Sequence, residues 1–189
     1  MAELLEWTDD LALGEAQMDA THREFVERLN ALAASDDAGF IPALDRFIAH
    51  SDAHFTDENE RMEATNFPPT HCHSNEHTQV LNLCQEVRQM VLDGKLEVGR
   101  VLANELAPWF TQHAQSMDAM LAYWLNLDDA GRAESLRQSA EHQAAMQAQL
   151  AAQGLTDAPQ MCGAGCEHDH SDHADHAHGE AHAEARTTV

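Results

Sequence analysis

The stretch His54-Phe55-Thr56-Asp57-Glu58 carries a histidine and a carboxylate four residues apart. On an α-helix, two residues at this spacing lie one above the other on the same face. Imidazole and carboxylate groups together form sites that iron, zinc, manganese and copper accept in proteins. The stretch therefore predicts a helix with one metal-binding face, and related spacings recur along the chain.

Three further segments carry side chains of the same kinds. His73 and His77 are four residues apart, His113 precedes Asp118 by five, and His22 stands alone on a stretch of apolar periodicity. Each pattern by itself arises by chance on exposed helices, but together they place ligand-type residues on four successive predicted helices. Five histidines and two carboxylates are more than one ion needs, and they suit a two-metal centre inside a helix bundle.

Apolar periodicity predicts four helices at about 19–34, 41–65, 70–93 and 96–126. The sequence Asn66-Phe67-Pro68-Pro69 cannot continue a helix, and Gly94 is a natural helix end. The expected fold class is all-α: an antiparallel up-down-up-down four-helix bundle over residues 1–127. Residues 128–156 are expected to form a helical extension, and residues 157–189 a disordered acidic tail rich in His and Cys.

The fourth predicted helix has two irregular features. Pro108 removes one backbone N–H, and its ring collides with the carbonyl group of Asn104, so we expect a kink. His113 and Asp118 are five residues apart, which is about 140° on a regular helix. For both to face one metal centre, either Asp118 must reach across or the helix must contain a local π-type turn.

Two other histidines stand close to the candidate ligands. His50 precedes His54 by four residues and could be a further contact, but Glu58 already completes the pair, so we expect His50 one layer further out. His71 points away from His77 on a helical wheel and is left out of the site.

The composition limits the classes of partner. The chain has 189 residues and a formal net charge of −23, from 33 acidic and 10 basic residues. Such a surface repels nucleic acid and anionic lipid, so we expect neither as a partner. The N-terminal segment has no basic region followed by an apolar run, and no stretch is long enough to span a membrane. We therefore expect a cytoplasmic protein.

In these motifs the sequence resembles the hemerythrin family in its bacterial single-domain form. The resemblance covers roughly residues 4–127. The features that carry it are Trp7, Asp19 three before His22, His54-Phe55 with Glu58 and Met62, the Pro-containing loop, His73 with His77, and Trp109 four before His113 with Asp118.

The resemblance implies two iron ions per chain, joined by an oxo or hydroxo bridge and held by His22, His54, Glu58, His73, His77, His113 and Asp118. Three of the histidines, His73, His77 and His113, would ligate one iron. The other two histidines would ligate the second iron, and both carboxylates would bridge the pair. The second iron then keeps one open position, at which dioxygen would bind.

The function that this implies is reversible dioxygen binding, as an oxygen carrier, a store or a sensor input. Five neutral imidazoles and two carboxylates stabilise oxidised iron less than a carboxylate-rich site does, which favours release of dioxygen. Phe55 and Trp109 are expected to line the oxygen pocket and exclude water. The alternative is a di-iron enzyme that handles peroxide or nitric oxide, or a protein of metal homeostasis. The sequence shows no substrate pocket and no dedicated acid–base residue, so we do not expect an enzyme.

The tail offers a second set of candidate metal ligands: Cys162, Cys166, His168, His170, His173, His176, His178 and His182. Imidazole and thiolate groups bind zinc, nickel, cobalt or copper. A flexible segment loses entropy when it is ordered, so its affinity should be modest. One interpretation is a metal reservoir or sensor arm; the other is a solvated acidic tail whose histidines are incidental.

Overall fold

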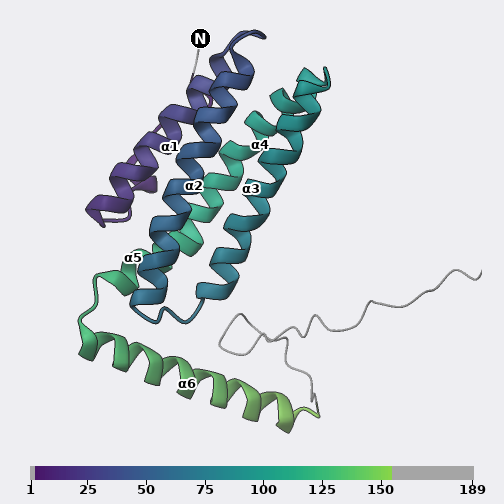
Figure 1. Ribbon diagram of the computed structural model, residues 1–189. Helices are drawn as coiled ribbons and strands as arrows, with labels where there is room; N and C mark the ends of the chain where they lie inside the picture. Colours follow the sequence, from purple (N-terminus) through teal and green to yellow (C-terminus); the bar gives the residue numbers. More distant parts are fainter. Residues whose placement is uncertain (1–2, 155–189) are drawn as a thin grey trace, which may run out of the picture.

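The computed structural model describes residues 3–154, and four long helices dominate this part of the chain (Figure 1). They are α1 (Ala16–Ala34), α2 (Phe40–Ala64), α3 (Thr70–Leu92) and α4 (Leu96–His113). Short connections make neighbouring helices antiparallel, and α1 packs on α2, α2 on α3, α3 on α4, and α4 on α1. The fourth long helix continues through a π-helical segment (Ala114–Asp118) into α5 (Ala119–Leu125). The predicted all-α four-helix bundle is confirmed.

The helix α1 begins three residues before the predicted position, and the residue that caps it is Glu15. The Glu15 carboxylate accepts a hydrogen bond from the backbone N–H of Met18 at 2.8 Å. Asp19 lies in the first turn and accepts instead from the backbone N–H groups of Leu13 at 2.7 Å and Gly14 at 3.1 Å. The Asp19 carboxylate therefore holds the segment that precedes α1.

The end of α2 is formed by a left-handed residue, as in many helix termini. Asn66 has φ 52°, the Phe67 N–H donates to the Met62 carbonyl at 2.9 Å, and the Asn66 N–H donates to the Glu63 carbonyl at 3.1 Å. These two bonds satisfy carbonyl groups that the helix end leaves free. Phe67 is buried beside Met62, so the turn into α3 is also held by apolar packing.

Two glycines shape the turn between α3 and α4 and the start of α4. Gly94 has φ 89°, which permits the Lys95 N–H to donate to the Met90 carbonyl at 3.0 Å. Gly99 lies on the first turns of α4, where a Cβ atom would stand 2.5 Å from a ring carbon of Phe40. The absence of a side chain at Gly99 makes room for the Phe40 ring against α4.

Buried apolar side chains form two clusters along the bundle. The larger contains Phe25, Phe47, Phe55 and Phe110, and the smaller contains Met18, Met62, Phe67, Leu121, Ala122 and Trp124. The Trp124 indole N–H donates to the Thr65 hydroxyl at 3.1 Å, which ties the smaller cluster to the end of α2. The candidate ligands fall between the clusters, since Glu58 lies between Phe55 and Met62 on α2. A band of polar groups therefore crosses an otherwise apolar core.

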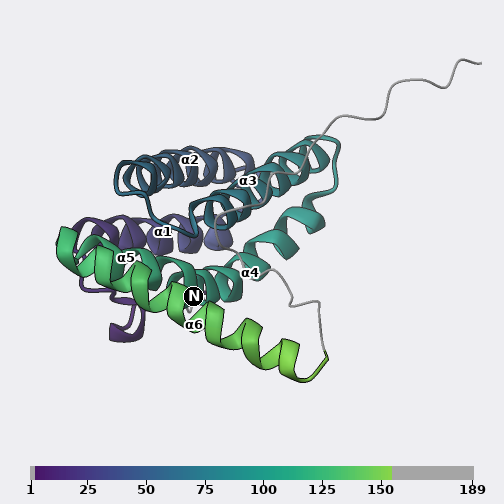
Figure 2. The same cartoon turned by 90° about the horizontal axis from the view of Figure 1, so that it is seen from below.

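Beyond the bundle, α6 (Asp129–Ala152) crosses below one end instead of lying alongside the other helices (Figures 1 and 2). It has no buried residue. Its first turns are attached to α5, because the Arg132 guanidinium donates to the carbonyl groups of Trp124 at 3.2 Å and Leu125 at 3.5 Å. A helix thus lies where the sequence predicted an extension. The predicted tail, with its Cys and His residues, lies outside the described residues. No helix in the described part of the chain combines the length and apolarity needed to cross a membrane.

Candidate metal centre

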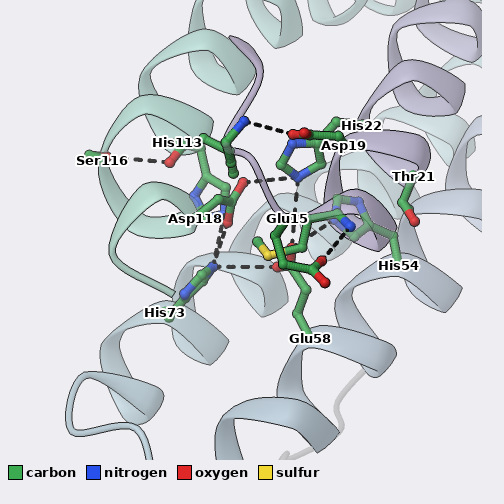
Figure 3. A network of polar contacts seen from close by, with 12 residues as sticks. Glu15, Asp19, Thr21, His22, His54, Glu58, His73, His113, Ser116 and Asp118 are labelled. Carbon is green, nitrogen blue, oxygen red and sulfur yellow. Dashed lines mark hydrogen bonds and ion pairs between the residues drawn. The ribbon is translucent and has the colours of Figure 1, made fainter. Parts of the chain in front are cut away.

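Four helices and the π-helical segment bring the seven ligands predicted within the bundle to one place, and Figure 3 shows how His22, His54, Glu58, His73, His113 and Asp118 lie there. One residue comes from α1, two from α2, two from α3, one from the end of α4 and one from the π-helical segment. Each side chain is at most 4% exposed: His22, His54, Glu58, His73, His77, His113 and Asp118. The spacing of four residues on α2 and α3 turns both members of each pair inward, as the sequence predicted.

Glu58 stands between two groups of histidines. Its Oε1 atom lies 3.0 Å from Nε2 of His54 and 3.7 Å from Nε2 of His22. Its Oε2 atom lies 3.3 Å from Nε2 of His77 and 3.6 Å from Nε2 of His73. Each carboxylate oxygen therefore faces a different pair of imidazoles.

Asp118 divides its oxygens in the same way (Figure 3). Its Oδ2 atom lies 3.3 Å from Nε2 of His22, and its Oδ1 atom lies 3.0 Å from Nε2 of His73 and 3.1 Å from Nε2 of His113. Both carboxylates thus join a two-histidine position to a three-histidine position. This is the arrangement expected of two carboxylates that bridge two cations.

The distances among the three histidines fit one shared ion. Nε2 of His113 lies 3.1 Å from Nε2 of His73 and 3.1 Å from Nε2 of His77. Two nitrogen atoms that each bind an ion at about 2.1 Å and at right angles lie about 3.0 Å apart. Nε2 of His113 therefore lies at the separation of adjacent ligands on one metal ion from both of the other nitrogens, and all three lie within 4.8 Å of one another.

Several buried polar atoms of the cluster have no hydrogen-bond partner in the described part of the chain. They include both carboxylate oxygens of Asp118, Oε2 of Glu58 and Nε2 of His22. Buried polar groups are usually paired, because leaving them unpaired costs the free energy of desolvation. All of these atoms point into the cluster, so bound cations would satisfy them. The donor set and the unpaired atoms both fit two metal ions.

The π-helical segment explains how His113 and Asp118 reach the same centre. Of the two alternatives that the sequence left open, the structure has the π-type turn, over Ala114–Asp118. The wider turn lets residues five apart share a face. Upstream, α4 continues through Pro108 as a helix. The kink expected at Pro108 stays a prediction.

The two remaining histidines near these motifs lie outside the cluster. His50 is half-buried on the α1 side of α2, where its Nδ1 atom stands 3.6 Å from the Glu24 carboxylate. Burial, together with the nearby His54 imidazole, lowers the pKa of His50, so it is neutral at pH 7. His71 is exposed at the start of α3.

Both aromatic residues that were predicted to line an oxygen pocket contact ligand histidines. The Phe55 ring stacks on His77, with centroids 4.0 Å apart and an interplanar angle of 6°. The Trp109 ring stacks on His113 at 4.9 Å and 21°. Both rings therefore cover the three-histidine side of the cluster. Their role in an oxygen pocket stays a prediction.

The two-histidine side has a different aromatic wall, which sequence reasoning did not assign to the site. Phe110 meets His22 edge-on with centroids 5.2 Å apart, and Phe25 stacks on Phe110 at 4.2 Å. Phe25 also lies 6.4 Å from the His54 ring. A signal for both residues exists, since each is three positions from a ligand on its own helix.

The metal-free cluster is a network of charges. Burial disfavours the imidazolium form of His22, but the Asp118 and Glu58 carboxylates beside its Nε2 atom outweigh burial and raise the pKa of His22 to about 9. Burial also disfavours the charged form of His113, but the Asp118 carboxylate at 3.1 Å outweighs burial and raises the pKa of His113. Burial raises the pKa of Glu58, yet its histidine partners lower it to about 2. Burial lowers the pKa of His77 to about 3. Without metal, the carboxylates are ionised and protons balance their charge.

Comparison with known proteins gives a consistent result. The family model of the hemerythrin HHE cation binding domain matches residues 13–125. A bacteriohemerythrin of Ralstonia nicotianae is 50% identical over 122 residues, which cover 65% of this chain and 89% of that protein. A bacteriohemerythrin of Stenotrophomonas maltophilia is 28% identical over 123 residues, covering 63% of this chain and 80% of the relative. Among solved structures, a hemerythrin carrying one leucine-to-alanine substitution has a TM-score of 0.62 and 20% identity, over 67% of this chain and all of that one, and shows the same fold.

Proposed function

We propose that this chain, which belongs to the hemerythrin family, binds dioxygen reversibly at a centre of two iron ions. The observation that carries the proposal is the way in which Glu58 and Asp118 divide their oxygens between the two groups of histidines. Two iron ions held there would supply the electrons that dioxygen takes on binding and would recover them on its release.

In this proposal the side chains have distinct roles. His73, His77 and His113 hold one ion, and the two remaining histidines hold the other. Glu58 and Asp118 would hold both ions, one with each oxygen. The two-histidine position offers fewer protein ligands, so dioxygen would bind on that side. Neither Phe25 nor Phe110 can donate a hydrogen bond, so their rings keep water and protons from that side.

The surroundings of the cluster support binding over turnover. Within residues 3–154, Ser51 is the one buried polar side chain besides the seven candidate ligands. A further buried acid or base, which an enzyme would use to move protons on a substrate, is therefore absent from the core of the described residues. The proposed role is that of an oxygen carrier, a store or a sensor input, and the protein is not proposed to be an enzyme.

Two predictions from the sequence accompany this proposal. We propose that Cys162, Cys166 and the six histidines of the tail bind zinc, nickel, cobalt or copper weakly, as a reservoir or sensor arm. These residues lie outside the described part of the chain. We also propose that the protein works in the cytoplasm.

The proposed function can be tested with the full chain produced in iron-supplied cells. The purified protein should contain two iron ions per chain. After anaerobic reduction it should be colourless, should colour on exposure to air and should bleach when oxygen is removed, over repeated cycles. The His54→Ala variant is the control and should not form a stable coloured state. Full occupancy by zinc, or iron that air oxidises irreversibly, would contradict reversible binding. Prompt oxidation with consumption of added peroxide would favour the enzyme alternative.

A further inference from the structure

Glu76 lies on α3 beside the ligand His77, but its own side chain faces α4. Its Oε1 atom accepts a hydrogen bond from the indole N–H of Trp109 at 3.0 Å. The same oxygen stands 3.3 Å from Nδ1 of His113. The side chain is 32% exposed, so the carboxylate reaches the cluster from its outer edge.

This contact distinguishes His113 from the other candidate ligands. Its Nδ1 atom has a carboxylate at ion-pair distance, although the metal-free geometry is not aligned as a hydrogen bond. The Nδ1 atoms of the other four histidines are buried and have no hydrogen-bond partner in the described part of the chain: His22, His54, His73 and His77. One imidazole in five therefore faces a negative charge on the side away from the ions.

A carboxylate in this position has a known physical effect. A histidine that binds a metal ion through Nε2 carries its proton on Nδ1, and an acceptor there fixes both the tautomer and the orientation of the ring. The charge also makes the imidazole a stronger donor to the metal. The Trp109 ring stacks on His113, and its indole N–H donates to the same Glu76 oxygen that faces His113. The Glu76 carboxylate therefore contacts both the ligand His113 and the ring that shields it.

We propose that Glu76 is a positioning residue of the metal centre, which fixes the tautomer and orientation of His113 and holds the Trp109 indole against it. The proposal rests on the proposed di-iron function. Its consequence is an asymmetry between the two ions, since Glu76 strengthens the three-histidine position and, among residues 3–154, no carboxylate plays this part for His22 or His54. Removing Glu76 should therefore weaken one iron site more than the other.

The test compares four full-length proteins: wild type, Glu76→Ala, Glu76→Gln and the control Glu86→Gln, which changes an exposed carboxylate on the same helix. Competition with a chelator under anaerobic conditions measures the affinity for iron(II). Nitrogen–proton NMR spectra of the metal-free proteins measure the indole N–H signal of Trp109, assigned with the variant Trp109→Phe. The second measurement needs no metal and reports the hydrogen bond directly.

We expect Glu76→Ala to lose about tenfold in affinity for one of the two irons and to shift the Trp109 signal. Glu76→Gln keeps an acceptor oxygen without the charge, so it should restore most of the indole signal and only part of the affinity. Glu86→Gln should match the wild type in both measurements. Wild-type iron affinity in Glu76→Ala, or an equal loss in Glu86→Gln, would overturn the inference. If the wild type itself takes up no iron, the proposed function fails instead, and the indole signal still tests the Glu76 contact.

Discussion

Loading of the metal centre should release protons and should depend steeply on pH. In the metal-free chain, Nε2 of His22 stands 3.3 Å from Asp118 and 3.7 Å from Glu58. Burial opposes protonation of His22, but these two carboxylates outweigh it and raise its pKa to about 9. An ion that binds this nitrogen must displace the proton, because only the neutral imidazole is a ligand.

The size of the effect follows from the distance between pH and pKa. At pH 7 the solution is two pH units below the pKa of His22, which is about 9, so nearly all of the His22 side chains carry the extra proton. Displacing it costs about 2.7 kcal/mol, which is about a hundredfold in affinity. At pH 9 the group is half deprotonated, so the affinity should rise about fiftyfold between pH 7 and pH 9. The raised pKa of His113 adds to the slope in the same direction.

Zinc is a suitable probe for this prediction, because it undergoes no oxidation. Chelator competition at several pH values, corrected for protonation of the chelator, gives the affinity, and a pH indicator dye counts the protons released. At least one proton per chain should appear at pH 7. The variant His50→Ala should show the same slope, since burial keeps His50 neutral at pH 7. An affinity that stays constant from pH 7 to pH 9, with no proton released, would refute the charge network described above.

Four further outcomes are expected. The free energy of unfolding of the metal-free chain, measured with urea, should fall by about 3 kcal/mol between pH 6.5 and pH 10. The pKa of buried His22 is 6.5 in the unfolded chain and about 9 in the folded one, so its protonation stabilises the fold fully below pH 6.5, and this contribution is lost as the pH rises through about 9. Phe110→Ala should cost about 3–5 kcal/mol in urea unfolding and, in spectra followed over time, should shorten the life of the oxygenated protein. His54→Ala should lose iron in a metal assay, whereas His50→Ala should keep two ions per chain; iron loss from the second variant would contradict the assignment on α2. Deletion of residues 157–189 should remove weak zinc equivalents from a calorimetric titration without changing the oxygen-dependent spectrum, and unchanged zinc binding would mean that the tail is not a metal site.

The local parts of the site could be predicted from the sequence, because they depend on one helix at a time. A separation of four residues decides that two side chains share a face, whatever the helix later packs against. That rule places His54 with Glu58, and His73 with His77. Apolar residues on the same stripes show which face is inward. The bundle then follows from four such helices with short connections.

Other parts depend on contacts between helices, and the spacing along one helix does not reveal their partners. The bond from Trp109 to Glu76 joins residues 33 positions apart, and it exists because α3 and α4 pack side by side. In the same way, Phe110 reaches His22 only after α4 has packed on α1. The start of α1 was misplaced for a related reason. Glu15 and Asp19 are both acids that could cap the helix. Asp19 accepts hydrogen bonds from N–H groups of the preceding loop, so Glu15 is the residue that caps α1.

The π-helical segment shows how a local rule can fail in a way that is still interpretable. Before it, Leu106, Phe110 and His113 repeat at helical spacing and are all buried. After it, Asp118 and Leu121 begin a second buried stripe. Each stripe is regular by itself, but the two are out of phase by one residue. On a regular α-helix, the Asp118 side chain would point about 140° away from His113. Its carboxylate would then lie apart from the histidines, and burying it there without a partner would be costly. The π-type turn over Ala114–Asp118 accommodates the extra residue where the two stripes meet. The irregular turn of the helix therefore lies between two candidate ligands, His113 and Asp118.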